Sequence, residues 1–179
     1  MKKNNKLQAV FLDRDGTIGG DDTIHYPGEF RLFPGVTENI SKLQEKGIKV
    51  FAFTNQPGIA EGLTTKTAFI HELLSFGFDQ VYICPHAPEA ECKCRKPNPE
   101  MLQQAAEDYK LSLARTVVIG DRWSDMVAAS KVGAMKILVK TGAGKQTLKE
   151  HQERLKDIEL DKVVEGIEEA MNVIHREYI

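Results

Sequence analysis

The sequence predicts an α/β fold with a doubly wound, mainly parallel sheet. Short apolar runs that favour strands alternate with segments of helical periodicity along the chain. Polar residues follow four of the five expected strands, each time at the strand's carboxyl end. Strands that alternate with helices imply right-handed crossovers and a sheet covered on both faces. The 179 residues contain no repeat, low-complexity tract or linker, so we expect a single domain over 1–179.

Each expected element rests on a local pattern. The first strand, 9–12, is a wholly apolar run that ends at acidic residues. The first helix, 36–47, places Val36, Ile40 and Leu43 on one face and closes at Gly47. A strand at 48–53, a helix at 65–76 and a strand at 81–83 come next, before a segment rich in proline and cysteine.

The second half continues the alternation. A helix at 99–109 has proline near its first turn, where the missing N–H costs little. A strand at 116–119, a helix at 124–132 and a strand at 135–139 follow. The tail from residue 145 is predicted to be mostly helical, with Val163, Ile167, Ala170 and Ile174 as its packing stripe.

Composition excludes several classes of function. The formal charge of −2 gives no basic field, so we expect no nucleic-acid partner. The apolar runs are far shorter than the ~20 residues that a membrane helix needs, so we expect no membrane association. The basic start has no small-residue cleavage site, so we expect no signal peptide and a cytoplasmic location.

Two acidic pairs follow the first and fourth predicted strands. Asp13 and Asp15 are two residues apart and precede Gly16, which permits a sharp turn and close approach of backbone N–H groups to an anion. Asp121 and Asp125 are one helical turn apart, so both can face the same crevice. Clustered carboxylates repel one another unless a cation neutralises them, and hard oxygen ligands favour magnesium.

Further polar residues suit a phosphorylated substrate. Thr54 and Asn55 follow the second strand, while Arg95 and Lys96 supply positive charge for a phosphoryl group. A single aspartate after a strand is usually a helix cap or turn residue, so the prediction rests on the combined set. A calcium loop of the EF-hand kind lacks its glutamate at position twelve.

All three cysteines lie close together with one histidine. Cys84, His86, Cys92 and Cys94 fit a closed tetrahedral zinc site, whose role would be to fold an irregular loop. The spacing differs from the commoner Cys-x-x-Cys, and three unrelated thiols beside a surface histidine are the alternative.

These motifs resemble the haloacid dehalogenase (HAD) superfamily. Its four motifs match DRDGT (13–17), TN (54–55), the lysine of RKP (96) and GDRWSD (120–125), which together span most of the chain. The resemblance implies that Asp13 attacks phosphorus to form an aspartyl-phosphate, while Asp15 protonates the leaving oxygen and then activates water. It also implies Mg²⁺ held by Asp13, the Asp15 carbonyl and Asp121 with support from Asp125, and phosphoryl contacts from Thr54 and Lys96. Substrate contacts are expected from Gly16, Thr17, Asn55, Arg95 and Arg122.

The cysteine cluster narrows the resemblance to the group of histidinol-phosphate and heptose 1,7-bisphosphate phosphatases. In that group a zinc loop, here 84–94, replaces a cap domain, and the segment 17–30 would form a flap over the site. TNQPGIAEG (54–62) resembles the heptose enzymes' TNQSGIARG, with Pro57 and Glu61 as departures. The short gap between His86 and Cys92 is more like the histidinol-phosphate enzymes, and Arg122 stands where heptose enzymes more often have lysine.

We therefore expect a monomeric, magnesium-dependent phosphomonoesterase for a small phosphorylated metabolite, with a sugar bisphosphate favoured over histidinol phosphate. Two other classes remain as alternatives. A phospho-accepting receiver domain would carry its acceptor after the third strand, where this chain has Cys84. A catalytically silent zinc and phosphate binding module would have lost part of the catalytic set, and nothing is missing here.

Overall fold

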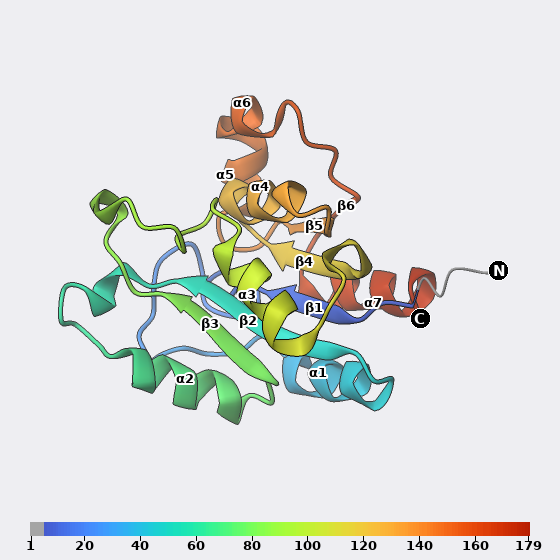
Figure 1. Ribbon diagram of the computed structural model, residues 1–179, viewed down its shortest axis with the longest axis horizontal. Helices are drawn as coiled ribbons and strands as arrows, with labels where there is room; N and C mark the ends of the chain where they lie inside the picture. Colours follow the sequence, from blue (N-terminus) through green and yellow to red (C-terminus); the bar gives the residue numbers. More distant parts are fainter. Residues whose placement is uncertain (1–5) are drawn as a thin grey trace.

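A computed structural model describes residues 6–179; the basic start of the chain, on which the signal-peptide expectation partly rests, lies outside the described residues. Six strands form one sheet in the order β3-β2-β1-β4-β5-β6, and every neighbouring pair is parallel (Figure 1). The strands are β1 (Ala9–Leu12), β2 (Lys49–Asn55), β3 (Gln80–Cys84), β4 (Thr116–Gly120), β5 (Met135–Val139) and β6 (Lys162–Val164). The predicted α/β fold with a parallel sheet is confirmed.

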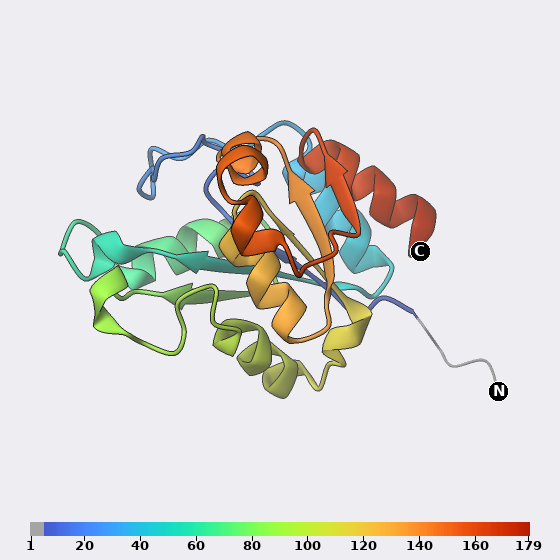
Figure 2. The ribbon, with the colours of Figure 1, turned by 90° about the horizontal axis from the view of Figure 1, so that it is seen from above.

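Helices cover both faces of the sheet, as Figure 2 shows. On one face α1 (Val36–Glu45), α2 (Lys66–Ser75) and α7 (Ile167–Glu177) pack on alternate side chains of the strands, including Val10, Leu12 and Ile119. On the other face α3 (Glu100–Tyr109) and α4 (Trp123–Lys131) pack on Phe11, Phe53 and the remaining set. The strands are buried from both sides because the crossover helices lie on both sides.

Local signals place the element ends close to their predicted positions. Thr65 caps α2 by accepting a hydrogen bond from the Ala68 N–H at 3.1 Å, and Pro99 immediately precedes α3. The strand order turns back between β1 and β4, since β2 and β3 extend to one side of β1 while β4, β5 and β6 extend to the other. In such sheets ligands bind beyond the carboxyl ends of the strands at this point.

The tail differs from the prediction. It contains two short helices, α5 (Gly144–Glu150) and α6 (Gln152–Leu155), but also β6, which extends the sheet at its edge. Val163 lies in β6 with 41% of its surface exposed, whereas Ile167, Ala170 and Ile174 are buried in α7. The period of the expected packing stripe therefore breaks at Gly166, where the strand gives way to the helix. Among residues 6–179 no helix has both the length and the apolar character to cross a membrane.

Candidate active site

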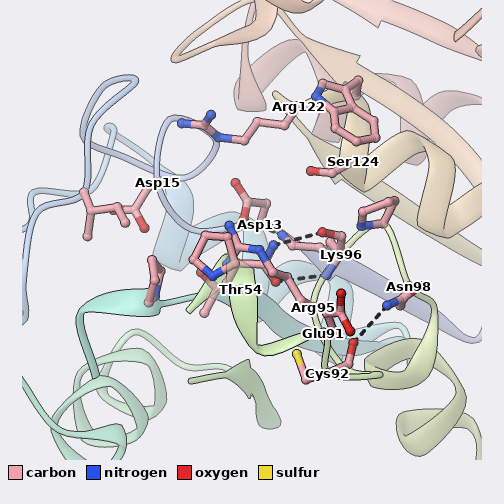
Figure 3. Close-up of a pocket in the computed structure, with 16 residues that line it drawn as sticks. Asp13, Asp15, Thr54, Glu91, Cys92, Arg95, Lys96, Asn98, Arg122 and Ser124 are labelled. Atoms are coloured by element: carbon pink, nitrogen blue, oxygen red, sulfur yellow. Dashed lines mark hydrogen bonds and ion pairs between the residues drawn. The ribbon is translucent and has the colours of Figure 1, made fainter. Parts of the chain in front are cut away.

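A cavity of about 540 Å³ opens at the carboxyl ends of the central strands (Figure 3). Its floor comes from the ends of β1 and β2, and its walls come from the segments that follow β3 and β4. The loop 17–30 reaches the same cavity through Ile24. The polar and charged residues that line it are Asp13, Asp15, Thr54, Asn55, Glu91, Arg95, Lys96, Asn98, Arg122 and Ser124.

Three carboxylates meet next to the base of this cavity, which Asp13 lines directly. Asp13, Asp121 and Asp125 each offer an oxygen within 4.8 Å of the others, and all three are buried. Burial, together with the Asp13 and Asp125 carboxylates, raises the pKa of Asp121 to about 9. Burial also raises the pKa of Asp125 to about 6, against the opposing effect of Lys96. Such a cluster is costly as three anions and suits a hard divalent cation such as magnesium.

Lys96 is the buried cation of the cluster. Its Nζ lies 2.8 Å from Asp13 Oδ1 and 2.7 Å from Asp125 Oδ1, and it donates to the Phe53 carbonyl at 3.0 Å. Burial alone would lower the pKa of Lys96, but the two carboxylates outweigh it and raise this pKa. Asn55 clamps the backbone of the lysine, since its Oδ1 accepts from the Lys96 N–H at 3.0 Å and its Nδ2 donates to the Lys96 carbonyl at 3.3 Å.

Asp15 lies at the edge of the cavity with both of its carboxylate oxygens engaged. Arg14 Nη1 lies 2.6 Å from Asp15 Oδ1, and Gln56 Nε2 donates to Asp15 Oδ2 at 2.7 Å. Gln56 Nε2 also lies within 2.9 Å of Thr54 Oγ1. Burial raises the pKa of Asp15, with the Arg14 guanidinium opposing it. Arg14 and Gln56 were not predicted as site residues; the available signal was their position, since Arg14 directly precedes Asp15 and Gln56 directly follows Asn55.

Two predicted substrate contacts have a different place in the structure. The Gly16 N–H donates to the Gly19 carbonyl at 2.8 Å, and Thr17 is fully buried with its hydroxyl 3.3 Å from Asp13 Oδ2. Neither residue lines the cavity, because the tight turn at Gly16 (φ +82°) directs both inward. They fix the geometry of the acidic cluster instead: a Cβ on Gly16 would lie 2.4 Å from Asp121 Oδ2.

Two arginines lie at the wall of the cavity. Arg95 precedes Lys96, and its Nη1 is buried without a hydrogen-bond partner among residues 6–179. Arg122 is exposed, and its Nη2 donates at 2.8 Å to the Asp22 carbonyl in the loop 17–30. Figure 3 shows Arg122 above Asp13 and Arg95 below it, so the cavity has positive charge on two sides.

The predicted zinc ligands come together beside this wall. The Cys92 sulfur lies 3.5 Å from the Cys84 sulfur and 3.7 Å from the Cys94 sulfur. His86 Nδ1 lies 3.2 Å from the Cys94 sulfur and 3.6 Å from the Cys84 sulfur. A tetrahedral zinc site with Zn–S bonds of ~2.3 Å has edges of about 3.7 Å. The four residues therefore fit zinc, and Arg95 and Lys96 follow the last of them directly in sequence.

The arrangement suits transfer of a phosphoryl group. It combines a buried carboxylate beside an ammonium, a second carboxyl at the cavity edge, an acidic cluster that fits a divalent cation, and guanidinium groups at the wall. Groups of this kind stabilise the charge on a phosphoryl group during displacement.

Known proteins share this chain's sequence and fold. The family model HAD-hydrolase-like matches residues 93–170. D-glycero-β-D-manno-heptose-1,7-bisphosphate 7-phosphatase of Haemophilus ducreyi is 34% identical, over 88% of this chain and 95% of the relative. The enzyme of the same name from Pseudomonas putida is 38% identical, over 79% and 87% of the two chains. The crystal structure of D,D-heptose 1,7-bisphosphate phosphatase from B. bronchiseptica, complexed with magnesium and phosphate, superposes with a TM-score of 0.80 at 30% identity, covering 96% of this chain and 99% of that one.

Fold, site and relatives define a phosphatase, that is a phosphoric monoester hydrolase. The chain belongs to the HAD-like hydrolase family, in the group of the heptose-bisphosphate phosphatases. The expected superfamily is thereby confirmed, and a receiver domain is not supported.

Proposed function

We propose that this protein removes one phosphate from a heptose 1,7-bisphosphate or a closely similar sugar bisphosphate, through an aspartyl-phosphate on Asp13. The observation that carries the proposal is the pairing of Asp13 with Lys96 at the base of a cavity whose walls carry Arg95 and Arg122. Two separated cationic sides suit a substrate with two phosphate groups. The relatives named above act on such a bisphosphate, which supports the sugar over the histidinol-phosphate alternative.

In the first step a carboxylate oxygen of Asp13 attacks phosphorus, and the bond between phosphorus and the ester oxygen breaks. Asp15 donates a proton to that departing oxygen, so that the sugar leaves as an alcohol. The Lys96 ammonium and the Thr54 hydroxyl bind the oxygens of the transferred group. A covalent intermediate divides one difficult displacement into two easier ones.

In the second step Asp15, now a carboxylate, takes a proton from the water that attacks the aspartyl-phosphate. The bond between phosphorus and Asp13 breaks, which restores the nucleophile and releases inorganic phosphate. Gln56, which donates to Asp15 Oδ2, holds the same carboxyl in place in both steps.

We further propose that Asp13, Asp121, Asp125 and the Asp15 carbonyl form the Mg²⁺ site, and that Cys84, His86, Cys92 and Cys94 bind structural zinc. Magnesium would supply positive charge that brings the substrate phosphate and the anionic Asp13 together. Zinc would fold the loop 84–94, in place of a cap domain, and so fix where Arg95 and Lys96 point. A single domain with 17–30 as a flap, a monomer and a cytoplasmic location complete the proposal; the bacterial relatives that act on a small sugar phosphate support the last of these.

The test is phosphate release, with Mg²⁺ present, from both anomers of D-glycero-D-manno-heptose 1,7-bisphosphate and from histidinol phosphate. We expect at least tenfold higher kcat/KM for one heptose anomer, and no turnover by a folded Asp13→Asn variant. Preferred hydrolysis of histidinol phosphate would refute the substrate assignment. An active Asp13→Asn variant would refute the nucleophile.

A further inference from the structure

A second buried cation lies beside the active site without facing it. Arg14 follows Asp13 in the chain and is completely buried, yet it does not line the cavity. Its guanidinium lies between two rings, with Cζ 3.9 Å from the centroid of Phe30 and 4.8 Å from that of Phe69. A buried guanidinium is costly unless it is fully paired, so its partners indicate what it is for.

The guanidinium bridges two carboxylates from distant parts of the chain. Arg14 Nε and Nη2 donate to Glu72 Oε2 at 3.0 and 2.7 Å, and Nη1 donates to Asp15 Oδ1 at 2.6 Å. Guanidinium is planar and rigid, so fixing one edge on Glu72 fixes the direction of the remaining N–H group. That group points at the carboxyl assigned above as the proton donor.

Glu72 is held in place by the helix that carries it. It belongs to the second turn of α2, which packs on the sheet through the fully buried Phe69 and Leu73. Its other oxygen, Oε1, accepts from the Gly28 N–H at 3.4 Å, and the His25 N–H of the same loop lies 3.4 Å from Asp15 Oδ1. The chain of contacts therefore runs from α2 through Glu72 and Arg14 to Asp15, and it includes two backbone groups of the loop 17–30.

We infer that Arg14 and Glu72 are positioning residues that hold the Asp15 carboxyl where it can give a proton to the departing oxygen. The inference rests on the proposed role of Asp15. Proton transfer requires heavy atoms within about 2.6–3.2 Å, so a carboxyl released from Arg14 would spend less time within reach of the ester oxygen. Attack by Asp13 itself does not depend on this contact.

Two substrates whose leaving groups differ in their need for a proton distinguish a loss of proton donation by Asp15 from a loss of attack by Asp13. The departing phenolate of p-nitrophenyl phosphate needs little protonation, whereas the alkoxide of an alkyl phosphate such as the sugar substrate needs it fully. For both compounds kcat/KM reports the steps through transfer to Asp13. The ratio of the two kcat/KM values is independent of how much of the protein is folded.

The main variant is Arg14→Met together with Glu72→Met, because removing one partner alone would leave a buried unpaired charge. We expect its alkyl-to-aryl ratio of kcat/KM to fall at least tenfold below the wild-type ratio. Glu72→Gln, whose amide cannot accept from both Arg14 and Gly28, should lower the ratio at least threefold, and it decides the question if the double variant does not fold. The matched control is Leu73→Ala, one residue away in α2, which loses packing only and should leave the ratio unchanged.

An unchanged ratio in a folded double variant, or in Glu72→Gln where only that variant folds, overturns the inference and leaves the proposed function intact. A wild-type protein that hydrolyses neither compound overturns the proposed function and the inference with it. A ratio that falls equally in Leu73→Ala also overturns the inference, because general loosening of α2 would then explain the effect.

Discussion

Replacing Lys96 with Met should expose the electrostatic cost of the acidic cluster. The Lys96 Nζ lies 2.8 Å from Asp13 and 2.7 Å from Asp125, and only 5% of the residue is exposed. Methionine fills nearly the same space but leaves the buried carboxylates of Asp13 and Asp125 without their ammonium. Removing one partner from a buried ion pair costs about 3–5 kcal/mol, and we expect a loss of that size in the free energy of unfolding.

The assay is urea unfolding at pH 7.5 with a chelator present, followed by circular dichroism. Adding Mg²⁺ should reduce the difference in the free energy of unfolding between variant and wild type, because a divalent cation replaces part of the lost positive charge. The same difference should also be smaller at pH 5, since protonated carboxyls need no neutralising positive charge. Lys131→Met is the matched control: this exposed lysine donates to the Pro97 carbonyl at 3.1 Å, and its loss should change stability by no more than about 0.5 kcal/mol. A loss below about 1 kcal/mol for Lys96→Met without metal would show that the ammonium is not needed to neutralise the acidic cluster.

Three further predictions follow from the metal sites and the tight turns. Cys92→Ser should bind less than half an equivalent of zinc by metal analysis and unfold at lower temperature; a wild-type protein purified without zinc, and unable to take it up, would contradict the zinc site. Because the pKa of Asp121 is raised from 3.8 to about 9 in the folded protein, the contribution of this carboxyl to metal-free stability should be fully present below about pH 4 and be lost as the pH rises through about 9. The rise in melting temperature on adding Mg²⁺ should therefore be larger at pH 8 than at pH 6, and an equal rise at both would count against the cluster. Gly142→Ala should destabilise the fold by more than about 2 kcal/mol, since its Cβ would lie 2.3 Å from Asp121 Oδ2 and 2.4 Å from the Gly16 Cα. The control is Gly133→Ala, whose Cβ would have no atom within 4 Å and which should cost only about 1 kcal/mol in the same unfolding assay.

Much of the site could be predicted because parallel strands end at one edge of the sheet. Asp13, Thr54 and Asp121 are more than a hundred residues apart at the extremes, yet each follows or ends a neighbouring strand. The spacing of their motifs indicated both the fold and the edge of the sheet at which these side chains come together. The strand at 162–164 was missed because three residues with one exposed valine carry no periodic signal.

Contacts that depend on side-chain direction could not be read from the sequence. Asn55 lines the cavity, so its expected substrate contact stays a prediction, but the sequence did not indicate that its amide also holds the Lys96 backbone forty-one residues away. The bridge from Glu72 through Arg14 to Asp15 includes partners fifty-eight residues apart; Arg14 lies in the DRDGT segment, but Glu72 lies in no motif, and nothing in the sequence links the two. Such pairs depend on how α2 packs on the sheet. Hydrophobic periodicity predicts which face of the helix is buried, but not which side chains make contact.

Trapping the covalent intermediate would show whether Asp13 carries the phosphoryl group during turnover. Protein would be mixed with the preferred substrate and Mg²⁺, quenched in acid within milliseconds, and treated with borohydride, which reduces an acyl phosphate to an alcohol. Peptide mass spectrometry should then find homoserine in place of aspartate at position 13, and at no other carboxylate. Turnover by the wild type with homoserine at Asp15, Asp121 or Asp125 and none at Asp13 would exclude Asp13 as the nucleophile.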